Sequence, residues 1–311
     1  MGAVTRRAWT LSAAAPALAI AGIGRRGLPR AELLQAPPIA AALPQESATA
    51  SQRNLAQSPL RGSRVGQVRW AGHLLRQASP TTCGAMSLLV LAALGDPVLA
   101  LWLTSGKRAG SVPPPELARL SREELALETV AERVAVAERH VHAAARHHSM
   151  LPWGSVPVDW PAAVGTPPWG AARAARFRGV AYTHAVVHDV DVARTRTILE
   201  TVRAANRLGI PVPLYSGGDL GRGGSPASAM PRHVVLAVPS RTAKPGELRI
   251  FEPGSGRIYG VGIDALLARR RPHAALGGWR HVVWAVLPAA AYGADVTRDP
   301  RRHALRVSVL G

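Results

Sequence analysis

The fold of this 311-residue chain follows from one stretch, Arg76-Gln-Ala-Ser-Pro-Thr-Thr-Cys-Gly-Ala-Met86, which contains its only cysteine, Cys83. An apolar run follows, Met86 to Leu94, long enough to form a buried helix. A thiol in the first turn of a helix lies where the helix dipole favours the thiolate. Gln77 can return on a short loop and direct its amide to the same point. The stretch predicts either the nucleophile and donor of an acyl-transfer site or a small buried apolar Cys.

Two strand-like runs near the C-terminus offer partners for the thiol. Pro231 to Val238 is predicted to be a strand led by His233, and a second strand begins at Glu247 and ends at Glu252 before a Gly-Ser-Gly turn. If these strands pair antiparallel, His233 and Glu252 lie close together. The carboxylate would then hold the imidazole in one tautomer while the other ring nitrogen faces the cysteine. The functional residues therefore follow the chain order Gln, Cys, His, acid.

This set of motifs resembles a known family. Gln-x5-Cys-Gly, a His opening an apolar strand and an acid-Pro-x-x-Gly hairpin are similar to the papain-like peptidases that process bacteriocin (double-glycine) leader peptides and to their stand-alone bacterial relatives. The resemblance covers roughly residues 70 to 288, over two thirds of the chain. It implies that Cys83 is the nucleophile, His233 the general base and acid, and Gln77 an oxyanion-hole donor. Glu252 stands where the family usually has Asp, and Thr82 where it often has an acid.

The resemblance implies an α+β fold, with an N-terminal helical half that carries Cys83 and a C-terminal antiparallel sheet half that carries His233 and Glu252. Residue periodicity predicts further elements: a helix over 195–208, a strand over 210–215, a short helix over 263–271 and a closing strand over 281–287. We expect three segments: 1–63, a signal-like or disordered segment with a linker; 64–288, the peptidase domain; and 289–311, a C-terminal tail.

Residues 115–148 are predicted to form one long helix. Ser121-x-x-Glu124 has the form of a capping box, and apolar residues continue at helical spacing. The basic end, Arg139 to His148, contains histidines, but their spacing does not suit a metal ion, so we expect a solvated helix end. His184 and His188 share one face of a predicted strand without a third ligand. The sequence predicts no metal and no cofactor.

Two irregular segments have two interpretations each. Residues 151–170 are rich in Pro and contain Trp153, Trp160 and Trp169. They would form either an apolar cleft wall for an extended peptide or a loop attached to the core by its indoles. Residues 216–230 are rich in Gly and Ser, and would form either a flap beside the site or a solvent loop.

The formal net charge is +19, which by itself suggests an anionic partner. Lys occurs only at positions 107 and 244, however, so that 38 − 2 = 36 of the basic residues are arginines spread over the whole chain. This skew is typical of GC-rich coding. The sequence contains no arginine stripe interleaved with aromatic residues, and we therefore expect no nucleic-acid partner.

The N-terminal segment resembles an export signal. Thr5-Arg-Arg-Ala-Trp9 precedes an Ala-rich apolar run with a possible cleavage site at Ala19-Ile-Ala21, although Arg25 and Arg26 follow at once. This pattern favours twin-arginine export or a membrane tether, with a cytoplasmic location as the alternative. A single cysteine allows no intrachain disulfide and so does not indicate the compartment.

The sequence thus predicts a cysteine peptidase or amidase that cleaves a peptide or protein substrate through a thioester. One alternative is a catalytically silent peptide-binding domain on the same fold. Another is a basic protein that binds nucleic acid or an anionic surface. A fast-reacting Cys83 at neutral pH favours the enzyme.

Overall fold

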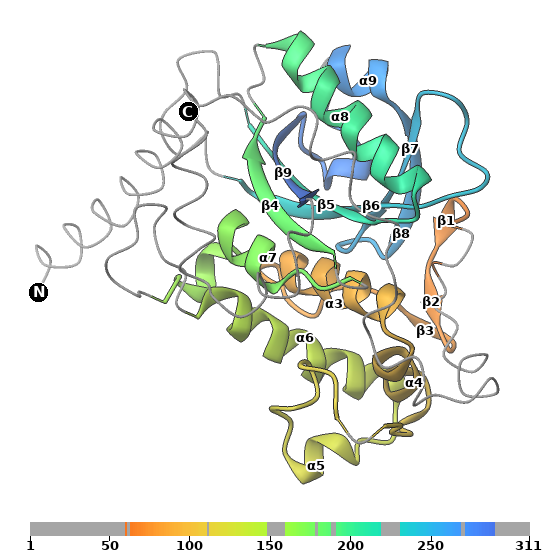
Figure 1. Cartoon of the computed structure of the whole chain (residues 1–311), viewed down its shortest axis with the longest axis vertical. Coiled ribbons are helices and arrows are strands. Elements are labelled where there is room, and N and C mark those ends of the chain that lie inside the picture. The colour runs from red at the N-terminus through yellow and green to blue at the C-terminus, as the bar shows by residue number, and fades with distance from the viewer. Residues whose placement is uncertain are drawn as a thin grey trace, which may run out of the picture.

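The computed structural model describes residue 60 and residues 63–110, 112–147, 159–177, 180–187, 191–218, 231–268 and 271–289. These residues form a mixed α and β structure built on one large antiparallel sheet (Figure 1). Helices α8 (Val192–Arg207) and α9 (Ile263–Ala268) lie on one side of this sheet. Helices α3 (Cys83–Gly95) and α7 (Pro168–Ala174) lie on the other. The coarse prediction of an α+β class is therefore confirmed.

The seven-stranded sheet has the order β1-β8-β7-β6-β5-β9-β4, and every neighbouring pair is antiparallel. In that order the strands are Gly66–Gln67, Arg257–Gly262, Glu247–Glu252, His233–Val238, Val212–Gly217, His281–Ala289 and Ala181–Val186. A separate two-stranded sheet pairs β2 (Arg69–Trp70) with β3 (His73–Leu74).

The central strands of the sheet are buried because helices cover both of its faces. In β6 every residue after His233 is buried, and all of β5 is buried. Continuous burial of this kind suits a strand enclosed on both faces better than one with a solvated face. The run predicted to be a closing strand is β9, which lies inside the sheet between β5 and β4. Strand β8, which pairs with β7, is the second arm of the predicted hairpin after Glu252, although its bounds were not predicted.

The helical half begins with α3 and α4 (Pro97–Ser105), which meet at Asp96. The Asp96 carboxylate accepts the backbone N–H groups of Val98 and Leu99, an ordinary N-cap. Its other oxygen binds Arg176 at 2.8 Å. In the described part of the chain no single helix is long and apolar enough to span a membrane; α3 and α4 reach that length only together, across a bend of 113°.

The prediction of one long helix over 115–148 is wrong. The structure has a short α5 (Arg122–Leu125) and a separate α6 (Val130–Arg146). The predicted capping box at Ser121 and Glu124 is present, but a second one, formed by Thr129 and Glu132, begins a new helix. The apolar spacing runs on through both helices, so periodicity alone did not show the break.

We expected the basic end of α6 to be solvated, but the structure shows that part of it is buried or paired. His142 is buried, at 9% exposure, whereas Arg139 and His140 bind Glu124. Burial lowers the pKa of His142 and so favours its neutral form. His148 lies outside the described residues.

The described part of the segment 151–170, which is rich in Pro and Trp, contains more regular structure than its proline content predicts. A 3-10 turn, η3, covers Ala162–Val164, and α7 begins at Pro168, where proline costs no hydrogen bond. The Trp160 and Trp169 rings meet edge to face at 5.3 Å, and Trp169 also contacts Trp284 of β9. The described indoles are thus attached to the core, as in the second interpretation; Trp153 lies outside the described residues.

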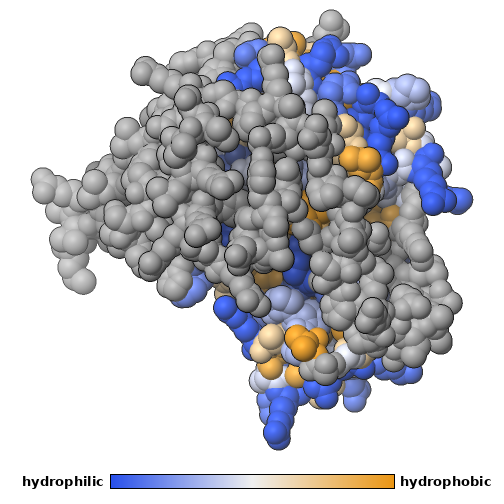
Figure 2. Space-filling model, in the orientation of Figure 1, coloured by the Kyte–Doolittle hydropathy of each residue, from blue (hydrophilic) through white to orange (hydrophobic). Residues whose placement is uncertain are grey.

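Further predictions also lie outside the described residues. They concern the signal-like segment and linker, apart from Leu60 and Ser63, together with His188, residues 219–230 and the tail beyond Ala289. On the face shown in Figure 2 the described surface is mostly hydrophilic. The large exposed apolar side chains of the described residues are scattered in sequence: Val65, Val112, Val164, Val192 and Leu208.

Candidate active site

Cys83 is the first residue of α3, as the sequence predicts, and is 5% exposed. The N-cap residue, Thr82, makes no side-chain capping bond to the helix. The first N–H groups of a helix have no intrahelical acceptor, and in α3 the N-cap side chain does not bind them. One turn later the Ser87 hydroxyl donates to the Val234 carbonyl at 3.4 Å, which joins α3 to β6 beside His233.

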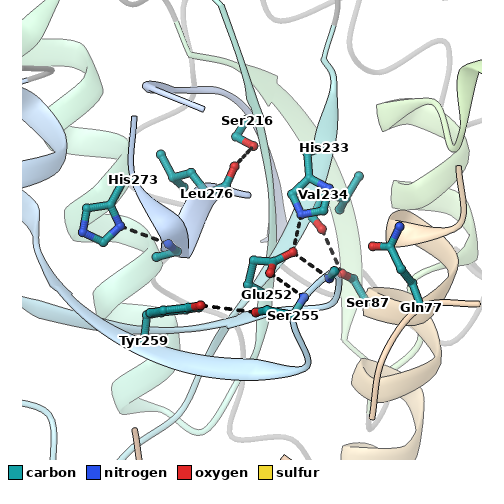
Figure 3. A network of polar contacts seen from close by, with 12 residues as sticks. Gln77, Ser87, Ser216, His233, Val234, Glu252, Ser255, Tyr259, His273 and Leu276 are labelled. Atoms are coloured by element: carbon teal, nitrogen blue, oxygen red, sulfur yellow. Dashed lines mark hydrogen bonds and ion pairs between the residues drawn. The ribbon is translucent and has the colours of Figure 1, made fainter. Parts of the chain in front are cut away.

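His233 and Glu252 form the centre of the polar network in Figure 3. His233 opens β6 and Glu252 ends the neighbouring strand β7, so antiparallel pairing brings them together. The His233 Nε2 atom lies 2.7 Å from Glu252 Oε1, and both side chains are largely buried, at 12% and 6% exposure. The carboxylate therefore fixes the plane and rotation of the imidazole.

The second ring nitrogen of His233 is left for the thiol. Cys83 lies close enough to His233 to raise the pKa of the ring. Because Nε2 is bound by Glu252, Nδ1 is the ring nitrogen left for the thiol. Burial favours the neutral ring, but the interactions with Cys83 and Glu252 outweigh it and raise the pKa of His233 from 6.5 to about 9. Cys83, His233 and Glu252 thus form one connected series.

Glu252 is held by the turn that follows it. Its Oε1 accepts the Gly254 N–H at 2.6 Å and its Oε2 accepts the Ser255 N–H at 2.7 Å. Burial opposes ionisation, but the hydrogen bonds from His233, Ser255 and Gly254 outweigh it and lower the pKa of Glu252 from 4.5 to about 2. The longer side chain of Glu, compared with Asp, is accommodated because the carboxylate bends back onto this turn.

Gln77 lies beside the same hairpin. Its backbone N–H donates to the Pro253 carbonyl at 2.9 Å, directly after Glu252. Its side-chain Nε2 donates to Ser79 O at 2.7 Å, which leaves the second Nε2 hydrogen available, and its Oε1 is buried without a hydrogen-bond partner. In Figure 3 the oxygen of the Gln77 amide lies on the side toward His233, and the nitrogen points toward the top of the view.

Two glycines allow the close packing around the site. A Cβ on Gly277 would lie 2.3 Å from the His233 ring, so the turn after η4 (Ala274–Leu276) rests directly against the imidazole. A Cβ on Gly84 would lie 2.6 Å from Thr166.

The Thr166 carbonyl accepts the hydroxyl of Tyr215 at 3.1 Å, and Cys83 lies close enough to Tyr215 to influence its ionisation. Burial, with this contribution, raises the pKa of Tyr215 well above 10.

Sequence reasoning missed Glu138, a buried carboxylate beside the loop that precedes Cys83. It lies on α6 at 1% exposure, and its two oxygens are 3.2 and 3.1 Å from the Ala78 backbone nitrogen. A signal was present in the sequence: Glu138 falls four residues after Val134 and three before Val141, within the apolar face of the helix. A charge at such a position needs a partner in the interior.

Among the described residues no group of three or more His, Cys, Asp or Glu side chains could hold a metal ion. The chemistry that the described residues can supply is nucleophilic. They offer a thiol at an uncapped helix start, an imidazole beside it and a carboxylate that orients the imidazole. Comparison with protein-family models, curated proteins and solved structures found no match for this chain.

Proposed function

We propose that the chain is a papain-like cysteine peptidase or amidase, in which Cys83 attacks a peptide or amide carbonyl. The observation that carries this proposal is the connected series Cys83–His233–Glu252, assembled from α3, β6 and β7. The helical half supplies the thiol and the antiparallel sheet supplies the imidazole and the acid, the division that the family resemblance implies.

The reaction divides into two acyl-transfer steps. His233 takes the proton of Cys83, and the thiolate attacks the carbonyl carbon to give a tetrahedral intermediate. The C–N bond then breaks, the leaving amine takes the proton from His233, and a thioester remains on Cys83. Water attacks the thioester with His233 as general base, releasing the acid and the free thiol.

The electrostatics support this sequence of steps. The raised pKa of His233, about 9, favours the imidazolium, the form that pairs with a thiolate. Glu252, with its pKa near 2, stays ionised through the cycle and stabilises the positive ring. The N–H groups at the start of α3 and the free hydrogen of the Gln77 amide are the donors proposed for the oxyanion.

A general acyl donor tests the proposal without knowledge of the natural substrate. With p-nitrophenyl acetate, the thiolate displaces p-nitrophenolate and becomes an acetyl thioester; with one cysteine in the chain, mass spectrometry of the Cys83 peptide identifies it. We expect the native protein to be acetylated at Cys83 at neutral pH at least about a hundredfold faster than the urea-unfolded chain.

His233→Ala should remove this acceleration. The matched control is His140→Ala, because His140 also contacts a carboxylate, Glu124, but lies on α6 and forms part of a more exposed pair. The control should keep the wild-type rate. Equal rates for native and unfolded chains would refute the enzyme and favour the catalytically silent binding domain.

A further inference from the structure

The loop between Gln77 and Cys83 is held by a residue from another helix. The Glu138 carboxylate on α6 accepts the backbone N–H of Ala78, which directly follows Gln77. Its side chain also lies close enough to the hydroxyl of Thr82, which directly precedes Cys83, for that hydroxyl to lower the pKa of Glu138. One buried carboxylate therefore contacts both ends of the segment that joins the proposed oxyanion donor to the proposed nucleophile.

The segment folds on itself around Ser79. The Ser79 carbonyl accepts the Gln77 side-chain amide at 2.7 Å and the Thr82 hydroxyl at 2.9 Å, and the Ser79 N–H donates to the same hydroxyl at 3.1 Å. These bonds set the shape of the loop. Its position relative to α6 depends on the contacts with Glu138.

Glu138 is an ionisable side chain buried in the interior of the protein. Burial raises the pKa of Glu138 from 4.5 to about 7, and its interactions with Thr82 and Ala78 only partly oppose this rise. Keeping such a group buried costs free energy of folding, which an apolar residue of the same size would avoid.

We infer that Glu138 is a positioning residue of the proposed active site, which fixes both ends of the segment 78–82 and so holds the Gln77 amide and Cys83 on either side of one oxyanion. This inference rests on the proposed function. Glu138 itself touches neither the reacting atoms nor the thiol; it acts through the backbone of Ala78 and the hydroxyl of Thr82.

Glutamine at position 138 can make the same bonds. In its protonated form Glu138 would accept the Ala78 N–H with its carbonyl oxygen and donate to the Thr82 hydroxyl, whose own hydrogen is donated to Ser79 O. The Gln amide reproduces this pattern with its oxygen and its NH₂ group. Alanine makes neither bond, and aspartate is one methylene too short to keep both.

Two reactions of Cys83 separate positioning from general damage. Acetylation by p-nitrophenyl acetate passes through an oxyanion, whereas alkylation by iodoacetamide is a displacement at carbon without one. A variant that disturbs only the oxyanion donors should slow acetylation and leave alkylation nearly unchanged. We therefore compare the two rates in wild type and in Glu138→Gln, Glu138→Ala and Glu138→Asp, with Glu200→Ala on α8 as a control for loss of a helical carboxylate.

We expect Glu138→Ala and Glu138→Asp to lower the acetylation rate at least about tenfold, part of the loss caused by deleting an oxyanion donor, and to change alkylation less than about threefold. Glu138→Gln and Glu200→Ala should keep both rates. If Glu138→Ala does not fold, the Asp and Gln variants decide the question.

Wild-type acetylation in the Ala or Asp variant, or an equal fall of both rates, would overturn the positioning role and leave the proposed function standing. A wild-type protein that is acetylated no faster than its unfolded chain would overturn both. The two failures are therefore distinguishable in one set of measurements.

Discussion

The Nε2 atom of His233 lies 2.7 Å from Oε1 of Glu252, across two neighbouring antiparallel strands. The same carboxylate accepts two backbone N–H groups of the following turn, so it cannot turn away from the imidazole without losing three hydrogen bonds. This arrangement fixes which ring nitrogen faces Cys83. Glu252 therefore orients the imidazole in addition to ending strand β7.

Glu252→Gln should therefore lower turnover or Cys83 acetylation by orders of magnitude while the fold is kept. The single oxygen of the amide can accept only one of the two turn N–H groups that now bind separate carboxylate oxygens, and the amide no longer stabilises the imidazolium. The measurement is the acetylation rate beside that of His233→Ala, with Glu124→Gln as control because Glu124 also contacts a histidine and an arginine. Near-wild-type activity would leave a Cys–His dyad and reduce Glu252 to a turn residue.

Gly277→Ala should displace the imidazole. The new Cβ would lie 2.3 Å from the His233 ring, and the backbone at φ +65° already disfavours alanine. Gly278→Ala is the matched control, since it has φ +84° but nothing within 4 Å of a new Cβ. Both variants should lose about 1 kcal/mol in free energy of unfolding from backbone strain. Acetylation of Cys83 should fall only in Gly277→Ala, and equal rates in the two variants would contradict the contact.

Gln77→Ala tests the oxyanion donor. Removing one such donor lowers the rate of acyl transfer by about 10²–10³-fold. Acetylation of Cys83 should fall by that order, whereas alkylation by iodoacetamide should stay near the wild-type rate. If acetylation is unaffected, the donors are the backbone N–H groups of α3 without Gln77.

The raised pKa of His233 has a consequence for stability. Its folded pKa, about 9, is above the ordinary 6.5, so its contribution is complete below pH 6.5 and is lost as the pH rises toward 9. Chemical denaturation should show the wild type losing about 1 to 3 kcal/mol across this window relative to His233→Ala. A constant difference between the two proteins would show that the pairs with Cys83 and Glu252 do not bind the ring more strongly when it is charged.

Much of the sheet half was predictable, because its strands are short apolar runs bounded by Gly and Pro. The start of α3 at Cys83, the strands that begin at His233 and end at Glu252, and the helix before Gly209 follow local patterns. The order of strands in the sheet did not follow from them. The place of β9 between β5 and β4 depends on long-range pairing that periodicity does not encode.

The candidate site, like the sheet, could be predicted from the sequence only in part. The proximity of His233 to Glu252 could be predicted, because one antiparallel pairing produces it. The roles of Gly277 and Glu138 could not, since each approaches the site from an element far away in sequence. The break before α6 was missed because the Thr129–Glu132 capping box lies inside an uninterrupted apolar pattern.

The central claim, that His233 and the helix start activate Cys83, is tested most directly by alkylation with iodoacetamide at about pH 6. At that pH a free thiol, with its usual pKa near 8.5, is almost entirely protonated and reacts slowly. The account predicts that native Cys83 reacts at least about tenfold faster than the same residue in the unfolded chain, and that His233→Ala abolishes this advantage. A native thiol that reacts no faster than the unfolded one at pH 6, with or without His233, would contradict it.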